Sequence, residues 1–252
     1  MRTSLLKLEV LKDRGTKDIL AALLVTLVSI GFMSVTFFSY DFRSTMDTSE
    51  FAWPKLLDNI LLMKVIIMPV FIASIAGRSV EIEDAHNMWN LIKSSGVSLQ
   101  KLYFTKFLYC ALKLFIFQII DWIITLSFIH LGGMTQQAPL LLISTTFVSQ
   151  LAISYMLLAI HYVLSLKWSN QLISTAISII GALSGIIFLL LGSEFSSFNP
   201  YSWMGHLMTI GTEKTADGWN MYFIDQDPKI FILSLIIGTL ILIVGSKLMR
   251  SK

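Results

Sequence analysis

Four ionisable side chains lie within or beside the long apolar runs of this sequence. They are Asp58, Lys64, Lys113 and Asp121. A charge inside a membrane segment is costly and therefore suggests a function, such as lining the path of an ion or a charged substrate. Asp121 is the deepest of the four, and Lys64 is about two turns inside its run. Two interpretations of Asp121 and Lys64 stay open, a buried polar contact between helices or a pathway for a cationic substrate.

Sequence motifs for nucleotide, metal or hydrolytic chemistry are missing. The chain contains no G-x-x-x-x-G-K-[S/T], no H-E-x-x-H and no G-x-S-x-G. Its single cysteine, Cys110, cannot form an internal disulfide or a cysteine-based metal site, and its four histidines are scattered over different segments. We therefore expect no catalytic residue, no metal site and no cofactor on this chain. No basic cluster interleaved with aromatic residues suggests nucleic acid binding.

The longest polar stretch between two apolar runs, EIEDAHNMWNLIKSSGVSLQKLYFTKF, begins at Glu81. At 100° per residue, Ile82, Ala85, Trp89 and Ile92 fall on one face, which predicts an amphipathic helix from about Val80 to Lys93.

Acids and small residues mark the ends of this predicted helix. Glu81, Glu83 and Asp84 suit the positive end of its dipole. Gly96 is a candidate left-handed cap, and Ser98 can cap the next helix. Glu81 lies at the edge of the apolar face, close to Arg78. It either stabilises the dipole or forms an ion pair at the membrane boundary that transmits movement.

The elements that position these residues are membrane spans. Only 14% of the 252 residues are charged, and the mean hydropathy is +0.72, which indicates an integral membrane protein. We expect an all-α fold in one transmembrane domain, residues 1–252, with an interfacial helix in residues 1–17. The six predicted spans cover residues 18–40, 57–77, 102–130, 139–166, 171–192 and 230–248.

Basic residues are distributed unequally between the two ends of these spans. Thirteen of the 19 Lys and Arg lie on the side of both termini, against four on the other side, so we expect both termini in the cytoplasm. Eight acids lie on the outer side. The outer loop 193–229 is rich in aromatic residues, and it either sits in the headgroup layer or faces a substrate. Tyr201, Trp203 and Trp219 are its candidate substrate contacts.

The polar stretch resembles that of ABC-2-type exporter permeases, specifically those of lantibiotic self-immunity transporters. The matching residues are Glu81, Glu83, Trp89, Gly96, Ser98, Lys101 and Lys106. The resemblance extends to the six-span layout, the short charged N-terminal segment and the NPYSW stretch of the last outer loop. One departure is Gly96, where many relatives have proline, and this leaves the subfamily open.

This resemblance implies a transport subunit, not an enzyme, in the cell membrane of a Gram-positive bacterium. Two copies of a separate ATPase would hold ATP and Mg²⁺, and a second, non-identical permease would complete the exporter. The substrate would be a cationic antimicrobial peptide taken from the membrane. The polar stretch would be the coupling helix that contacts the ATPase, through Glu81, Glu83, Asp84, Trp89, Lys93, Gly96, Ser98 and Lys101. Alternatives are export of a bacitracin-like peptide, drug or ion, or a non-transporting membrane sensor or enzyme.

Overall fold

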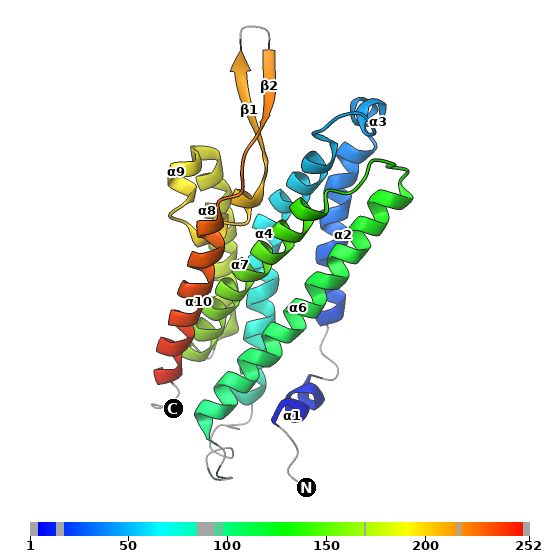
Figure 1. Ribbon diagram of the computed structural model, residues 1–252. Helices are drawn as coiled ribbons and strands as arrows, with labels where there is room; N and C mark the ends of the chain where they lie inside the picture. The colour runs from blue at the N-terminus through cyan, green and yellow to red at the C-terminus, as the bar shows by residue number, and fades with distance from the viewer. Residues whose placement is uncertain are drawn as a thin grey trace.

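Six long helices form the body of the protein in the computed structural model, which describes residues 5–13, 18–84, 94, 96, 98–168, 170–215 and 218–248. They are α2 (Asp18–Phe37), α4 (Ala52–Asp84), α6 (Leu99–Leu131), α7 (Leu140–Lys167), α8 (Gln171–Leu191) and α10 (Pro228–Leu248). All six are long and apolar enough to cross a membrane. The start of α2 and the end of α10 lie at the same end of the bundle (Figure 1), which we call the terminal end.

The central helix is α4, which packs against α2, α7 and α8. Its most apolar stretch is 67% buried, whereas the corresponding stretches of the other five helices are 28–44% buried. α4 and α6 each contain 33 residues, so each is about 50 Å long and extends beyond a hydrocarbon layer of about 30 Å.

The second span does not end where the sequence predicted. We expected a break after Gly77 and a new helix from Val80, but α4 continues without interruption to Asp84. The segment RSVEIED contains no glycine or proline to break the helix, and its Val80 and Glu83 are buried against the bundle. The start of the predicted coupling helix is therefore the last turn of the span itself.

A short helix, α1 (Leu5–Lys12), lies beside the terminal end of α6 (Figure 1). It lies within residues 1–17, where the sequence predicted a helix at the membrane interface. Leu8, Val10 and Leu11 are exposed on it, whereas Glu9 is buried. Leu5 and Leu6 are half-buried, so apolar burial provides only part of the attachment of α1 to the bundle.

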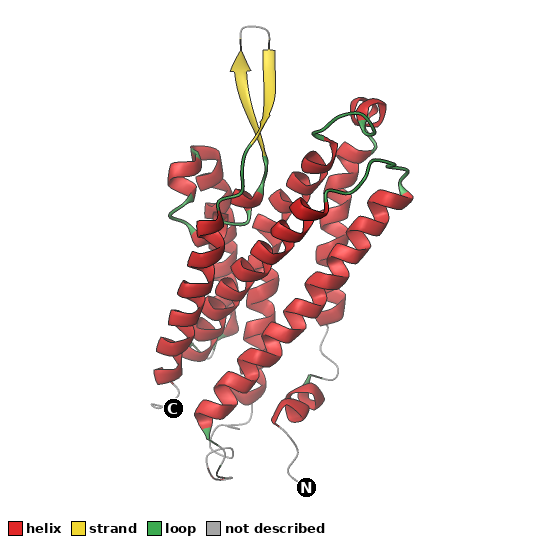
Figure 2. Ribbon diagram, viewed as in Figure 1, coloured by secondary structure: helices red, strands yellow, loops and turns green. Residues whose placement is uncertain are grey.

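The opposite end, which we call the loop end, carries α3 (Tyr40–Thr45), α9 (Ser193–Ser196) and the 3-10 turns η2 (Pro200–Ser202) and η3 (Gly205–Leu207). It also carries an antiparallel hairpin, β1 (Ile210–Thr215) and β2 (Gly218–Phe223), which projects beyond the helices (Figure 2). The fold is mostly helical, as predicted, but the hairpin was not predicted.

Contacts with the start of α4 and the residue before it hold the base of this hairpin. The buried carboxylate of Asp58 accepts hydrogen bonds from the backbone N–H groups of Thr209 and Ile210, at 2.9–3.1 Å. The ring of Phe51 stacks on that of Phe223, with the ring centroids 4.4 Å apart. Asp58 is thus a structural anchor for the outer loop.

Candidate functional site

Residues from four helices meet in a buried polar network in the middle of the bundle. Lys64 Nζ on α4 lies 2.7 Å from Asp121 Oδ2 on α6. Thr26 on α2 donates to Asp121 Oδ1 at 2.7 Å. Gln150 on α7 accepts hydrogen bonds from Lys64 at 3.3 Å and from Trp122 at 3.0 Å. We call these five residues the central network.

The central network is closed off from solvent. Lys64 and Asp121 are each 1% exposed, and each charge has an opposite charge and further hydrogen bonds around it, which is how buried charges are tolerated. The structure brings together two residues that the sequence identified only separately. Their geometry is that of a contact between helices, and neither side chain presents a surface to a substrate.

A second network joins α1 to the terminal end of the bundle. Lys12 lies 3.5 Å from Glu9 and 2.5 Å from Glu83 on α4. Lys106 on α6 lies 2.8 Å from Glu9 and 2.9 Å from Glu83, and donates to the backbone carbonyl of Ser79 at 3.0 Å. The four side chains form a closed ring of alternating charge, which we call the ionic ring.

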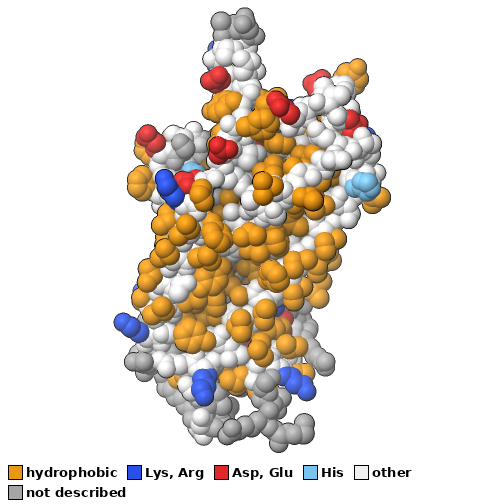
Figure 3. Space-filling model, in the orientation of Figure 1, with side chains coloured by type: hydrophobic (Ala, Val, Ile, Leu, Met, Phe, Trp, Pro, Cys, Tyr) orange, Lys and Arg blue, Asp and Glu red, His pale blue; other side chains and the backbone are white. Residues whose placement is uncertain are grey.

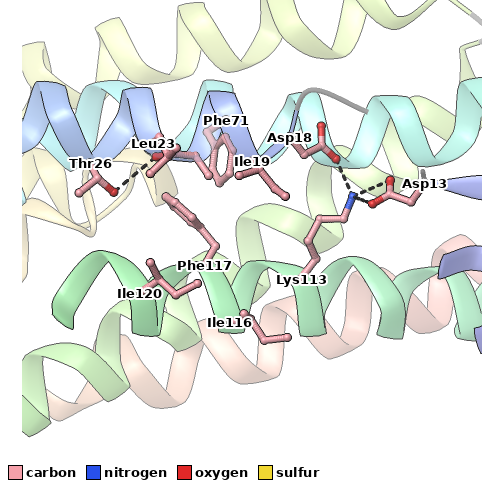
Figure 4. Close-up of a pocket in the computed structure, with 11 residues that line it drawn as sticks. Asp13, Asp18, Ile19, Leu23, Thr26, Phe71, Lys113, Ile116, Phe117 and Ile120 are labelled. Atoms are coloured by element: carbon pink, nitrogen blue, oxygen red, sulfur yellow. Dashed lines mark hydrogen bonds and ion pairs between the residues drawn. The ribbon is translucent and has the colours of Figure 1, made fainter. Parts of the chain in front are cut away.

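Next to the ionic ring, Lys113 on α6 bridges two carboxylates (Figure 4). Its ammonium lies 2.7 Å from Asp13 and 2.5 Å from Asp18. Tyr109 donates to Asp13, and Arg78 pairs with Asp18 at 2.5 Å. Arg78 therefore pairs with the first residue of α2, whereas Glu81, which the sequence placed close to Arg78, is exposed.

The structure separates the three acids of the predicted coupling segment. Glu81 is exposed, Asp84 is half-buried, and the side chain of Glu83 is fully buried in the ionic ring. Glu83 connects this segment to both α1 and α6. Trp89 and Lys93 lie outside the described residues.

The residues after the coupling segment show how α6 begins. Gly96 has a φ of +73°, the left-handed conformation expected of it. Ser98 occupies the position before α6, but its side chain makes no capping hydrogen bond, contrary to the prediction. Its backbone carbonyl accepts from Leu102 instead. Lys101 is exposed on the first turn of α6.

The three aromatic residues proposed for the substrate path have different surroundings. Trp203 is 4% exposed, and its indole N–H donates to the carbonyl of Ser197 at 2.9 Å. Tyr201 packs on α8, with its hydroxyl 3.2 Å from His161 Nε2, and burial raises the pKa of its phenol to about 12. Trp219, on β2, is 71% exposed. Only Trp219 is available to a molecule from outside.

Sequence reasoning missed the two residues of α1 that build the ionic ring. Neither Glu9 nor Lys12 was among the candidate site residues that the sequence indicated. The available signal was an acid and a base three residues apart, which share one face of a helix. Their partners are distant in sequence, so no local pattern reveals the pairing.

Residues 5–185, most of the chain, match the family described as ABC-2 family transporter protein. A comparison with curated proteins finds no match at a significant level. The family match agrees with the six apolar helices of the structure. Permeases of this family supply the membrane-embedded part of a transporter, and the ATPase is a separate subunit. The chain therefore belongs to the ABC-2 transporter family, as a multi-pass permease subunit that partners an ABC ATPase.

Proposed function

We propose that this permease belongs to an exporter that removes a cationic antimicrobial peptide of the lantibiotic type from the membrane, giving the cell immunity. The observation that carries the proposal is an exposed aromatic hairpin at an acidic end of the molecule. Trp219, Tyr222 and Phe223 are 46–71% exposed on β2. Figure 3 shows acidic side chains gathered at this end, basic ones mainly at the other end, and an apolar band between them.

These features suit a cationic amphipathic peptide, which accumulates in the headgroup layer with its apolar face buried. Acidic groups favour its encounter with the loop end, although exposed charges are screened within about 8 Å at physiological salt. Aromatic contacts from the hairpin then provide most of the binding free energy. Of the three aromatic residues, Trp219 is the best candidate for such a contact, because Trp203 and Tyr201 pack against other parts of the protein.

The orientation follows from the charge distribution. With the basic terminal end in the cytoplasm, the hairpin faces outward, where such peptides arrive. Cysteine substitution at Thr215 and at Ser251, in a background with Cys110 replaced by serine, tests this in intact cells. A membrane-impermeant reagent should label only the position at Thr215; labelling only at Ser251 contradicts the orientation.

ATP and Mg²⁺ bind to the partner ATPase, two copies of which serve this chain and a second, non-identical permease. The segment from about Val80 to Lys93 contacts the ATPase, with Trp89 as its anchor. In support, Glu83 at the start of this segment is directly linked to α1 and α6 through the ionic ring. The purified chain should have no ATPase activity without its partner, and a robust rate from the chain alone would refute this division of roles.

The substrate is tested by expressing the complete complex in a sensitive host. Tolerance to a lantibiotic should rise, and Trp219→Ala should lower it without loss of assembly. Phe198→Ala is a matched control, because Phe198 is 85% exposed at the same end but lies outside the hairpin. If the complex protects against an unrelated drug but against no lantibiotic, the protein is still an exporter, but the proposed immunity function is wrong. If no compound is exported, a non-transporting role becomes the better explanation.

A further inference from the structure

A groove of about 390 Å³ separates α2 from α6 in the half of the bundle nearest the terminal end. Its walls are apolar side chains of the two helices with one from α4 (Figure 4), namely Ile19, Leu23, Ile116, Phe117, Ile120 and Phe71. Ile19 is 78% exposed and Ile116 is 56% exposed. Because both lie on spans, the groove opens toward the acyl chains of the bilayer.

The two ends of the groove are polar. At the terminal end it is bordered by Asp13, Asp18 and Lys113, the bridged cluster described above. At the other end it reaches Thr26, whose hydroxyl donates to Asp121 of the central network. The apolar groove therefore runs from a charged cluster at the membrane boundary to the neighbourhood of the buried ion pair.

The length of this groove matches the thickness of one leaflet of the bilayer. Eight residues of helix separate Asp18 from Thr26, a rise of about 12 Å. Half of the hydrocarbon layer is about 15 Å thick. An extended acyl chain with its headgroup at the charged cluster fills such a groove, whereas a transmembrane helix of a partner would extend far past it.

The charges at the mouth select the headgroup. The Lys113 ammonium contacts both carboxylate oxygens of Asp13, at 2.7 Å, and one of Asp18. Its side chain is still 20% exposed, so a phosphate oxygen at the end of the groove can take over one of the two contacts now made to Asp13. Asp13 is partly exposed and can accept a further hydrogen bond from an ammonium. The carboxylates of Asp13 and Asp18 are already balanced by Lys113 and Arg78, so an anionic headgroup would leave one negative charge without a compensating cation. A zwitterionic headgroup that carries an amine satisfies both partners.

We propose that the groove between α2 and α6 is a binding site for one acyl chain of an amine-bearing, zwitterionic phospholipid, with its phosphate on Lys113 and its ammonium on Asp13. The lipid joins α1, α2 and α6, and its chain ends against Thr26. This inference requires only that the chain spans a membrane, and it does not rest on peptide export.

Native mass spectrometry of the complex, released from bilayers of equal phosphatidylethanolamine and phosphatidylglycerol, tests the site. One phosphatidylethanolamine should remain bound per chain. Leu23→Trp fills the groove and should abolish retention. Leu24→Trp is the matched control, because Leu24 is exposed on the same turn but does not line the groove. Equal loss in both variants, or retention in both, overturns the site.

The headgroup preference is tested with Asp13→Asn in the same bilayers. Loss of one charge-assisted hydrogen bond should reduce the preference for phosphatidylethanolamine over phosphatidylglycerol by about tenfold. An unchanged preference, or a wild-type preference for phosphatidylglycerol, overturns the assigned headgroup. A wild-type complex that retains no lipid overturns the whole proposal.

Discussion

The central network and the ionic ring both bury opposite charges between helices, but they connect different kinds of element. The central network joins α2, α4, α6 and α7, all of which are long spans with large apolar contacts of their own. The ionic ring joins the spans to α1, a short helix whose exposed face is apolar. The first network is one contact among many between its helices. The second attaches a helix whose apolar residues are at most half-buried.

The two networks should therefore have different roles, although both consist of opposite charges buried between helices. Breaking the central network should destabilise the whole bundle, because an unpaired charge would be left in its interior. Breaking the ionic ring should release α1 and leave the spans in place. One member of the ring, Glu83, lies inside the segment that we propose contacts the ATPase, so the ring is the better candidate for transmitting a movement.

Asp121→Asn should have the largest effect on stability. It leaves the Lys64 ammonium buried without a counter-charge, and breaking such a pair typically costs about 3–5 kcal/mol. The melting temperature in detergent measures the loss. Replacing both residues, Lys64→Met with Asp121→Leu, should restore most of the stability. If Asp121→Asn has the same melting temperature as the wild type, the central network does not stabilise the bundle as we expect.

Glu83→Gln should have a smaller and more local effect. It removes the partner shared by Lys12 and Lys106, a loss of about 2–3 kcal/mol for a buried charged hydrogen-bonding group. Hydrogen exchange of residues 5–12 should accelerate while exchange of α7 stays unchanged, and ATP hydrolysis by the complex should become less dependent on substrate. Glu81→Gln is the control for hydrogen exchange alone, because Glu81 is exposed and lies outside the ring but within the proposed ATPase contact. Equal acceleration of exchange in both variants would contradict the role of the ring.

Asp58→Asn extends the comparison to a buried carboxylate that is satisfied by backbone N–H groups. Weakening its hydrogen bonds to Thr209 and Ile210 should cost about 1–2 kcal/mol. Trypsin should then cleave faster after Lys214 on the hairpin, without a change in the exchange of α1. Asp41→Asn, an exposed substitution at the same end, should leave the cleavage rate unchanged.

A pH change should have the smallest effect and should be confined to the loop end. Burial lowers the pKa of His206 below its usual 6.5, and its Nε2 lies 2.8 Å from the hydroxyl of Ser196. The folded loop prefers the neutral ring, so its stability is fully present above pH 6.5 and falls as the pH drops below that value. Fluorescence of nearby Trp203 should report the change, and His206→Gln should remove it.

The spans and the intramembrane charges were predictable from the sequence, but their partners were not. Long apolar runs specify a membrane helix by composition alone, and a lysine or aspartate inside one is visible at once. The contact between Lys64 and Asp121 depends on how two helices rotate and cross, which no local pattern records. The same holds for Glu9 and Lys106, which are 97 residues apart.

The hairpin was missed for a different reason. Its strands, IGTEKT and GWNMYF, do not alternate between apolar and polar residues, because β2 is exposed on both faces.

The sequence also could not show that Glu83, and not Glu81, takes part in the ionic ring. The apolar pattern predicted a separate helix, whereas residues 80–84 continue α4, which begins at Ala52 and sets their orientation.

The central network has a consequence for the order of biosynthesis. Lys64 enters the membrane with α4 before α6 and α7 have been made, and Gln150 follows 86 residues later. At 5–20 residues per second, that delay is on the order of ten seconds. During this delay, the apolar residues of α4 alone must offset an insertion cost of about 3 kcal/mol for the unpaired ammonium of Lys64. The arrival of α6 and then α7 ends this exposure, so nascent chains truncated before Asp121 should be the ones that quality-control proteases remove.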